Sequence, residues 1–166
     1  MGDSVAKVVN RLRDAKETGK LDLSECELTQ IPDAVYVMLK DTIVISCDLS
    51  QNLLQSLSRK FCSKFTNLTE LKINGNTLHT LPDELRNLQE LQHLDVSNNN
   101  LDRIPQVVYQ CVRLKQLQIH TNSISEVDVM RLEAMDSLET LNLRGNPLPD
   151  DVKSQLSDSR LNVIKS

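Results

Sequence analysis

The feature that most constrains the fold is a motif of spaced leucines and asparagines that returns at a nearly constant interval. Its pattern is L-x-x-L-x-L-x-x-N-x-L-x-x-L, and five copies follow one another within the 166 residues. The Asn position is filled in turn by Asn52, Asn76, Asn99, Asn122 and Asn146. A partial copy before them has Cys26 in that position, so the intervals are 26, 24, 23, 23 and 24 residues. So regular a period indicates turns that bury their apolar side chains only against neighbouring turns.

Each copy of the motif predicts one short strand followed by an inward bend. The L-x-L part alternates apolar and polar residues, so its leucines point to one face of a strand and their neighbours to the other. Stacked turns place these strands in parallel. The Asn amide then lies just past the strand, where it can bond main-chain groups of its own turn and of the adjacent one. Because buried polar groups persist when they are bonded in this way, we interpret the five asparagines as structural.

The return path of three turns begins with an apolar residue and a proline, at Ile31-Pro32, Leu81-Pro82 and Ile104-Pro105. Apolar residues follow each proline by three positions, at Val35, Leu85 and Val108, and by six positions, at Met38, Leu88 and Cys111. A spacing of three predicts that both sets face inward from a helical turn. Cys26, Cys47 and Cys111 then fall at core positions. Cys62 follows Phe61 by one residue, and we expect its thiol to lie nearer the surface.

The two ends of a stack of strands need covers, since an exposed edge invites pairing with other chains. Apolar residues recur at helical spacing at Val5, Val8, Val9, Leu12 and Ala15, which predicts an amphipathic helix that ends at Gly19. Near the other end we expect Asp150 or Asp151 to N-cap a helix through Leu156, and residues 161–164 to add a final strand. The expected divisions are therefore residues 1–19, 20–149 and 150–166.

Composition and charge narrow the functional class. The net charge is −4 with no basic cluster of the kind that neutralises phosphates, so we expect no binding of nucleic acid. The longest apolar run covers residues 34–39, well short of the roughly 20 residues that span a bilayer, so we expect no membrane association. The first residues lack the apolar region of a secretory signal, which favours reduced cysteines in a cytoplasmic or nuclear chain. We also expect a monomer.

These repeats resemble the intracellular leucine-rich-repeat family of the Ras-suppressor and scaffold type, which has repeats of about 23 residues and a Leu-Pro signature. The likeness is carried by segments such as Leu78-His79-Thr80-Leu81-Pro82 and Leu141-Asn142-Leu143-Arg144-Gly145-Asn146. The resemblance implies an α/β solenoid with short parallel strands on a concave face and helical or irregular segments on the convex side. It also implies an interaction protein without an enzymatic role.

A search of the sequence for catalytic or metal-binding patterns also favours an interaction protein without an enzymatic role. The sequence has no C-x-x-C pair, no H-E-x-x-H, no phosphate loop and no G-x-S-x-G. His93 and His120 fall on neighbouring strands at offset positions, which separates them too far to share a metal easily. A catalytic Cys62 would need a nearby base to lower its pKa, and the spacing identifies none. We therefore expect no enzyme, no metal and no cofactor.

A partner is expected on the outward positions of the strands, which form the concave face. The residues we select for partner binding are Asp22, Asp48, Glu70, Lys72, His93, Asp95, Gln118, His120 and Arg144. The acidic character of the first four strands favours a protein with a basic surface. Tyr36, Arg86 and Tyr109 occupy equivalent positions on the convex side and form a second candidate surface. The alternative function is a structural subunit that docks in a larger assembly through the convex face or the caps.

Overall fold

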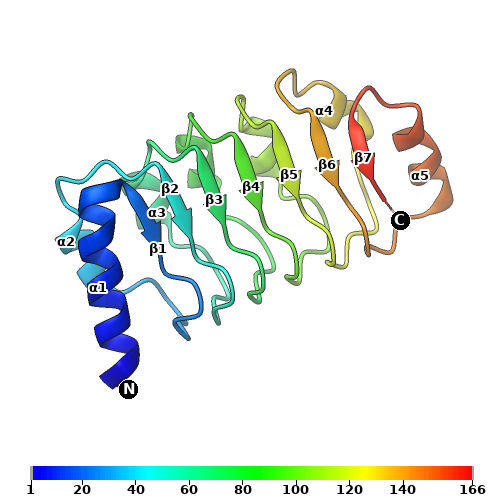
Figure 1. The fold of residues 1–166 in the computed structure, drawn as a ribbon. Helices are drawn as coiled ribbons and strands as arrows, with labels where there is room; N and C mark the ends of the chain where they lie inside the picture. The colour runs from blue at the N-terminus through cyan, green and yellow to red at the C-terminus, as the bar shows by residue number, and fades with distance from the viewer. Residues whose placement is uncertain (1, 166) are drawn as a thin grey trace.

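The computed structural model describes residues 2–165, which form one row of stacked turns (Figure 1). Seven three-residue strands make a single parallel sheet in chain order. They are β1 (Lys20–Asp22), β2 (Ser46–Asp48), β3 (Glu70–Lys72), β4 (His93–Asp95), β5 (Gln116–Gln118), β6 (Thr140–Asn142) and β7 (Asn162–Ile164). The predicted solenoid of short parallel strands is confirmed.

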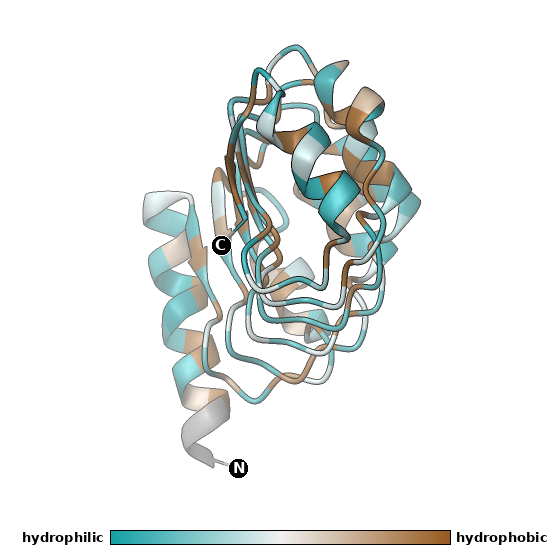
Figure 2. Cartoon of the chain, turned by 90° about the vertical axis from the view of Figure 1, so that its right-hand side faces the viewer, coloured by the Kyte–Doolittle hydropathy of each residue, from teal (hydrophilic) through white to brown (hydrophobic). Residues whose placement is uncertain are grey.

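Short helices return the chain behind the sheet. They are α2 (Asp33–Met38), α3 (Arg59–Lys64), η1 (Asp83–Asn87), η2 (Gln106–Gln110), α4 (Val129–Glu133) and α5 (Asp150–Ser157), where η marks a 3₁₀ helix. Figure 2 shows the strands along one side of the turns and these helices along the other. We call the sheet surface that faces away from the helices the concave face and the helical side the convex side. The apolar core fills the space between them.

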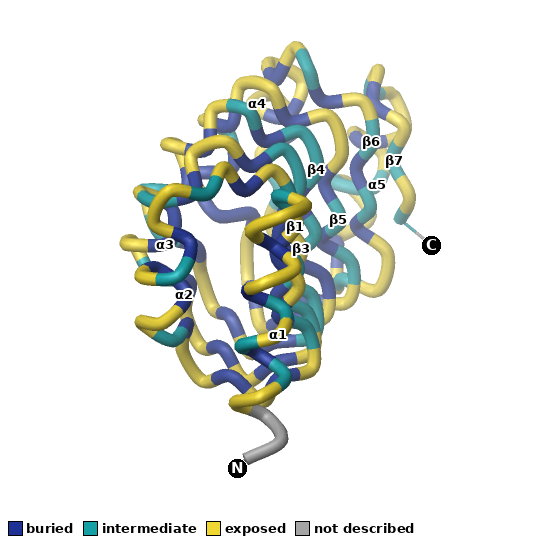
Figure 3. Tube along the Cα trace, turned by 60° about the vertical axis from the view of Figure 1, so that its left-hand side comes forward, coloured by how far each residue is buried: buried dark blue, intermediate teal, exposed yellow. Residues whose placement is uncertain are grey.

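Burial along each strand follows the predicted alternation. The central residue of every strand from β1 to β6 is buried, and its two neighbours are partly or fully exposed on the concave face (Figure 3). The core is aliphatic, as two Phe and two Tyr are the aromatic residues of the chain. Phe61 and Phe65 pack together on the convex side, with ring centroids 5.0 Å apart.

The asparagines tie consecutive turns together, as predicted. Asn76 donates from Nδ2 to the carbonyl of Ile73 in its own turn and to that of Leu49 in the turn before, both at 3.0 Å. Its Oδ1 accepts from the amide of Leu54 at 3.0 Å. The same three contacts recur at Asn99, Asn122 and Asn146. The described residues leave no buried side-chain polar atom without a hydrogen bond.

The residue just before each Asn position has a left-handed backbone, which the motif did not reveal. In these positions φ is positive at Glu25, Gln51, Gly75, Asn98, Thr121 and Gly145. In this conformation the amide of each of the first five bonds a carbonyl of the following turn, as between Gln51 and Asn74 at 2.9 Å. The bend therefore requires αL geometry in every turn, whether or not the residue there is glycine.

Two predictions about the convex side are wrong. Cys62 is fully buried, because consecutive residues of a helix are about 100° apart and both Phe61 and Cys62 fall within the inward arc of α3. Met38 is only partly buried, and Leu39 takes its place in the core. This segment is α-helical, and the Leu39 amide donates to the carbonyl of Val35. The next residue after Val35 to face the core is therefore four positions on, at Leu39, and not three.

The predicted spacing of three residues between core positions is found where the return segment is a 3₁₀ helix. The amide of Leu88 bonds the carbonyl of Leu85 at 3.0 Å, and that of Cys111 bonds Val108 at 3.1 Å. Leu88 and Cys111 are buried, as predicted. The six-position spacing after proline thus depends on helix type, which the apolar pattern did not distinguish.

The two ends are closed by α1 (Gly2–Thr18) beside β1 and by α5 with β7. Val8, Leu12 and Ala15 are buried, and Gly19 ends α1 with a φ of +69°, as predicted. Val5 is 66% exposed, contrary to the expectation that it shares the buried face. A 17-residue helix is longer than the three-residue strand it covers, so its first turns extend past the core.

At the C-terminal end the final strand is confirmed, but the expected side-chain cap is wrong. The N-cap of α5 is Pro149, and it makes no side-chain cap hydrogen bond. Asp150 and Asp151 lie inside the first turn of the helix, where the positive end of the helix dipole stabilises a carboxylate.

Candidate functional site

The concave face carries three ladders of outward-facing side chains, which are polar except at Ile164 in the last strand. Strand pairing aligns the first row, at Lys20, Ser46, Glu70, His93, Gln116, Thr140 and Asn162. The same pairings align the midline, at Asp22, Asp48, Lys72, Asp95, Gln118, Asn142 and Ile164. The third row lies just past the strands and includes His120 and Arg144. Their carbonyls accept hydrogen bonds from the amides of Asn98 and Thr121 in the preceding turns. The outward positions predicted from the motif therefore lie together on one surface.

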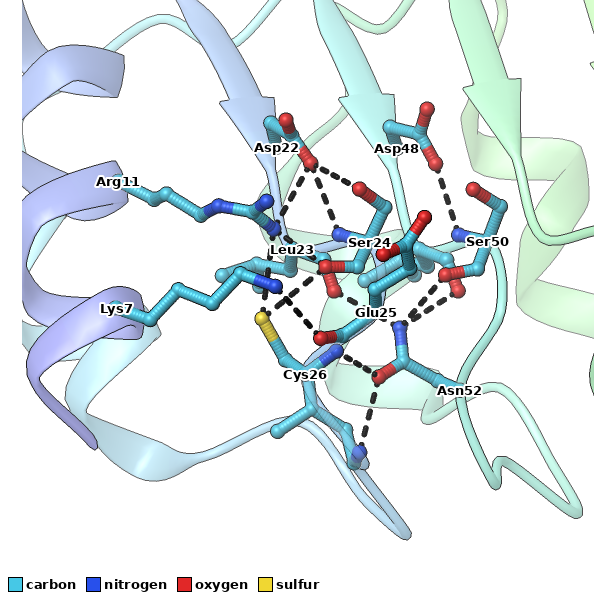
Figure 4. A network of polar contacts seen from close by, with 12 residues as sticks. Lys7, Arg11, Asp22, Leu23, Ser24, Glu25, Cys26, Asp48, Ser50 and Asn52 are labelled. Atoms are coloured by element: carbon cyan, nitrogen blue, oxygen red, sulfur yellow. Dashed lines mark hydrogen bonds and ion pairs between the residues drawn. The ribbon is translucent and has the colours of Figure 1, made fainter. Parts of the chain in front are cut away.

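The midline carboxylates also have a structural role that the sequence pattern concealed. Oδ1 of Asp48 accepts a hydrogen bond from the amide of Ser50 at 2.8 Å (Figure 4). Oδ1 of Asp95 accepts from the amide and hydroxyl of Ser97, at 3.0 and 2.6 Å. Asp22 and Asn142 make the equivalent turn with the residue two positions on. One side-chain oxygen at each position thus holds the end of the strand, and the second carboxylate oxygen of each Asp is not used in this turn.

The first carboxylate of the midline is neutralised from within the chain. Nη1 of Arg11 lies 3.1 Å from Oδ1 of Asp22, and Lys7 donates to the carbonyl of Glu25 at 2.8 Å (Figure 4). Partial burial raises the pKa of Asp22, but the hydrogen bonds from Ser24 and the charges of Arg11 and Lys7 outweigh it and hold that pKa below its usual value. The N-terminal helix therefore engages one of the residues selected for partner binding.

The Glu70 and Lys72 side chains form an ion pair at the centre of the face, with Nζ of Lys72 3.2 Å from Oε1 of Glu70. Ser46 donates to the other Glu70 oxygen at 3.3 Å. The hydrogen bond and charge of Glu70 raise the pKa of Lys72, partial burial lowers it, and Asp48 and Asp95 raise it further. Because this pair is neutral overall, Asp48 and Asp95 on either side of Lys72 carry the charge that a partner would meet.

A shallow hollow of about 340 Å³ opens on this face across β3, β4 and β5. Its polar lining comprises Glu70, Lys72, His93, Asp95, Gln116 and Gln118, over a floor of Leu71 and Leu94. Five of the nine selected residues therefore meet here, whereas Asp22, Asp48, His120 and Arg144 lie outside it. Gln116 was not selected, although its register opposite His93 is the signal that would have identified it.

The Cys62 thiol is buried, and the two histidines of the concave face are offset along neighbouring strands. Burial, with a smaller effect of the Glu84 charge, raises the pKa of Cys62 to about 12. His93 pairs in register with Gln116, so His120 lies four residues further along β5 and its continuation. Among residues 2–165 no group of three His, Cys, Asp or Glu side chains could hold a metal ion. Within the same described range, no helix is long and apolar enough to cross a membrane.

The structure does not bring the convex candidates together as an open surface. Tyr36 is 9% exposed, its ring lies 6.2 Å from that of Phe65, and Nζ of Lys60 lies over it at 4.2 Å. Tyr109 is half-buried, with the Arg131 guanidinium 4.3 Å from its ring centroid. Arg86 is exposed on η1, between them along the stack. Both tyrosines therefore cover the convex backbone.

Comparison with known proteins gives consistent matches. A leucine-rich repeat family profile matches residues 46–101 and 89–148, and a second one matches residues 137–161. Leucine-rich repeat-containing protein 20 of Mus musculus is 48% identical over 157 residues, which are 92% of this chain and 85% of that protein. The Homo sapiens protein of the same name is 38% identical over 96 residues, 55% of this chain and 52% of its own length.

Solved structures share the fold over most of the chain. The leucine-rich repeat domain of APL1B aligns with a TM-score of 0.69 and 23% identity, over 89% of this chain and 42% of that one. The leucine-rich repeat domain of APL1 aligns with a TM-score of 0.66 and 26% identity, over 76% and 33%. This chain therefore spans less than half the length of these solved chains.

Proposed function

The chain belongs to the leucine-rich repeat family, and from that premise we propose that it is a non-catalytic adaptor that binds a protein partner through its concave face. Domains of this family are in general protein–protein interaction modules, and the family is in general not enzymatic. We further propose that it acts as a monomer, without a cofactor, in the cytoplasm or nucleus, where its four cysteines stay reduced.

The observation that carries the proposal is the pair of carboxylates Asp48 and Asp95. Both lie on the outward side of the sheet, and neither forms an ion pair with another described residue. Complementary charge at an interface steers association and selects partners, so these groups favour a partner with a basic surface. Apart from Ile164, the rest of the face is polar, and it lacks aromatic side chains, which favours moderate affinity over tight, permanent assembly.

A second candidate function is that of a structural subunit docking by the convex side. Val37 in α2, Val112 after η2 and Met130 in α4 are 74%, 71% and 83% exposed. Apolar side chains at such positions can be covered by another protein, although single exposed residues are common in soluble proteins. The experiment below separates the two docking modes.

The test is a quantitative pull-down from cytosol with three versions of the full chain. The concave variant carries Asp48→Asn, Asp95→Asn and Gln116→Arg. Asparagine keeps the Oδ1 acceptor that holds Ser50 and Ser97, so the charge is removed without loss of the strand-end turns. The convex control carries Asp41→Asn, Asp136→Asn and Gln110→Arg at exposed positions, and it changes the net charge equally.

We expect a partner that the native chain and the convex control retain and the concave variant loses, with equal thermal unfolding midpoints for all three. A partner lost only from the convex control would contradict the concave site and support the structural-subunit function. Retention of every partner by the concave variant would also exclude the concave face.

A further inference from the structure

The hollow across β3, β4 and β5 has a charge balance that specifies what it can receive. Of its ionic side chains, Glu70 and Lys72 neutralise each other at 3.2 Å. Asp95 makes its hydrogen bonds with Ser97 through Oδ1 and has no ion pair among the described residues. The carboxylates and the ammonium of the hollow therefore leave one uncompensated negative charge, at Asp95 on its central strand β4.

Neutral acceptors lie beside that charge on the next strand. Gln118 is the register partner of Asp95 on β5, about 4.8 Å away across the pairing, and Gln116 is two residues along the same strand. The Gln118 amide is held by Asn142, which donates to its Oε1 at 2.8 Å. Within residues 2–165 the Gln116 side chain has no hydrogen-bond partner. One carboxylate and two amide side chains thus line a single open volume.

This combination discriminates between basic side chains. A lysine ammonium is a compact, strongly hydrated point charge whose three donors have no planar arrangement, so it gains less from acceptors that lie side by side along a hollow. A guanidinium is planar and carries five donors, so it can bond a carboxylate and adjacent amide oxygens at once. The hollow of about 340 Å³ is wide enough for such a group above the floor of Leu71 and Leu94.

We propose that the hollow receives an arginine side chain of the protein partner, which pairs with Asp95 and hydrogen-bonds Gln116 and Gln118. This inference rests on the proposed function and deepens it by naming the chemistry of the contact. Because the Glu70–Lys72 pair on β3 is neutral, Asp95 leaves the hollow with charge for one cation. The contact is local, and it differs from general attraction to an acidic face.

The test is a titration of the isotope-labelled full chain by NMR, with N-acetyl-Gly-Arg-Gly-amide as the probe. The matched peptides contain lysine or the neutral isostere citrulline in place of arginine. The variant is Asp95→Asn, and the control is Asp48→Asn, which removes the same charge from the same kind of strand-end turn outside the hollow.

We expect saturable shifts of the amides of residues 94–97 and 116–118 with the arginine peptide, and weaker binding of the other two. Asp95→Asn should weaken binding about fivefold, the upper range for a solvent-accessible ion pair, whereas Asp48→Asn should change it less than about twofold. Equal weakening by both variants, equal binding of the lysine or citrulline peptide, or no saturable shift would each overturn the arginine site.

Failure of this proposal and failure of the proposed function are distinguishable. If the peptide does not bind but the concave variant still loses a partner in the pull-down, the adaptor function stands and the arginine contact is wrong. If the peptide binds at Asp95 but the pull-down places the partner on the convex side, the hollow is an arginine site that the adaptor function does not use.

Discussion

The side-chain oxygen of Asn99 accepts a hydrogen bond from the backbone amide of Leu78 at 2.9 Å, across the boundary between two consecutive turns. The Nδ2 group of Asn99 donates to the carbonyls of Ile73 and Val96, each at 3.1 Å. One amide thus satisfies a donor and an acceptor of the previous turn and an acceptor of its own. Because each of the five turns with an Asn bonds its predecessor in this way, the ladder links the stability of each of these turns to that of its neighbour.

Replacing Asn99 by Ala should lower the free energy of unfolding by about 3 kcal/mol, because it leaves buried main-chain groups in two turns without partners. The measurement is equilibrium denaturation in urea. Asn100→Ala is the matched control, since Asn100 is exposed and its side chain makes no hydrogen bond to another described residue. A loss of equal size in the two variants would show that the ladder contributes nothing specific.

The motif was sufficient to predict the sheet because strand alternation and the Asn position depend on local spacing alone. Leu71, Leu94 and Leu117 are buried in register as the L-x-L pattern requires. The convex side was harder to predict. Whether Met38 or Leu39 faces the core depends on whether a six-residue segment is α or 3₁₀, and proline spacing is compatible with both.

The candidate face could be predicted as a surface but not as a site. Strand alternation placed Asp48, Lys72 and Asp95 outward, and their register confirms that placement. The turn bonds to Ser50 and Ser97 depend on backbone angles after the strand, which the polar pattern does not encode. The neutralisation of Asp22 required the docked position of α1, a contact between segments that the motif does not relate.

The contact between Arg11 and the first turn should stabilise the N-terminal cap. Arg11→Met keeps most of the apolar stem but removes the donors to Asp22 and to the carbonyl of Ser24. We expect the free energy of unfolding to fall by about 1–2 kcal/mol in urea denaturation at pH 7. Arg103→Met is the control, because Arg103 pairs with the exposed Asp102, and this variant should unfold like the native chain.

The contact between Arg11 and Asp22 should also make the free energy of unfolding depend on pH. The folded pKa of Asp22 lies below the unfolded value of about 3.9, so its contribution is present above that pH and is lost as the pH falls through the folded pKa. The difference between native chain and Arg11→Met should therefore be smaller at pH 3 than at pH 7. Solvent screening at this half-exposed carboxylate limits the change to less than about 1 kcal/mol. A difference that grows toward pH 3 would contradict the assignment.

The thiols of Cys62 and Cys111 should not react in the folded chain. Burial is the main cause that raises the pKa of each to about 12, so at pH 8 about one molecule in ten thousand carries a thiolate at either position. We expect Ellman's reagent to modify them only as fast as the chain unfolds, measured by thionitrobenzoate release with peptide mapping. Ser63→Cys supplies an exposed thiol next to Cys62 and should react within the mixing period. Rapid native-state labelling of Cys62 would contradict the protection that we assign to its burial.

The positive φ in each inward bend predicts a stabilising substitution. Thr121 has a φ of 53°, at the position that glycine occupies in the turns of Gly75 and Gly145. Left-handed geometry costs a side chain about 1–2 kcal/mol, and β-branching makes it less favourable still. The hydrogen bond between Thr121 Oγ1 and His120 is exposed and offsets little of this.

Thr121→Gly should therefore raise the free energy of unfolding by about 1 kcal/mol, because the relieved strain exceeds the entropy that glycine adds to the unfolded chain. Thr66→Gly is the control, since Thr66 is exposed and its φ is not positive. At Thr66 no strain is relieved, and glycine only adds entropy to the unfolded chain. We therefore expect the free energy of unfolding to fall by about 0.5–1 kcal/mol. Urea denaturation of both variants measures whether each substitution raises or lowers the free energy of unfolding. If Thr121→Gly destabilises as much as Thr66→Gly, the bend is not strained by its side chain, and the shared αL geometry is compatible with any residue.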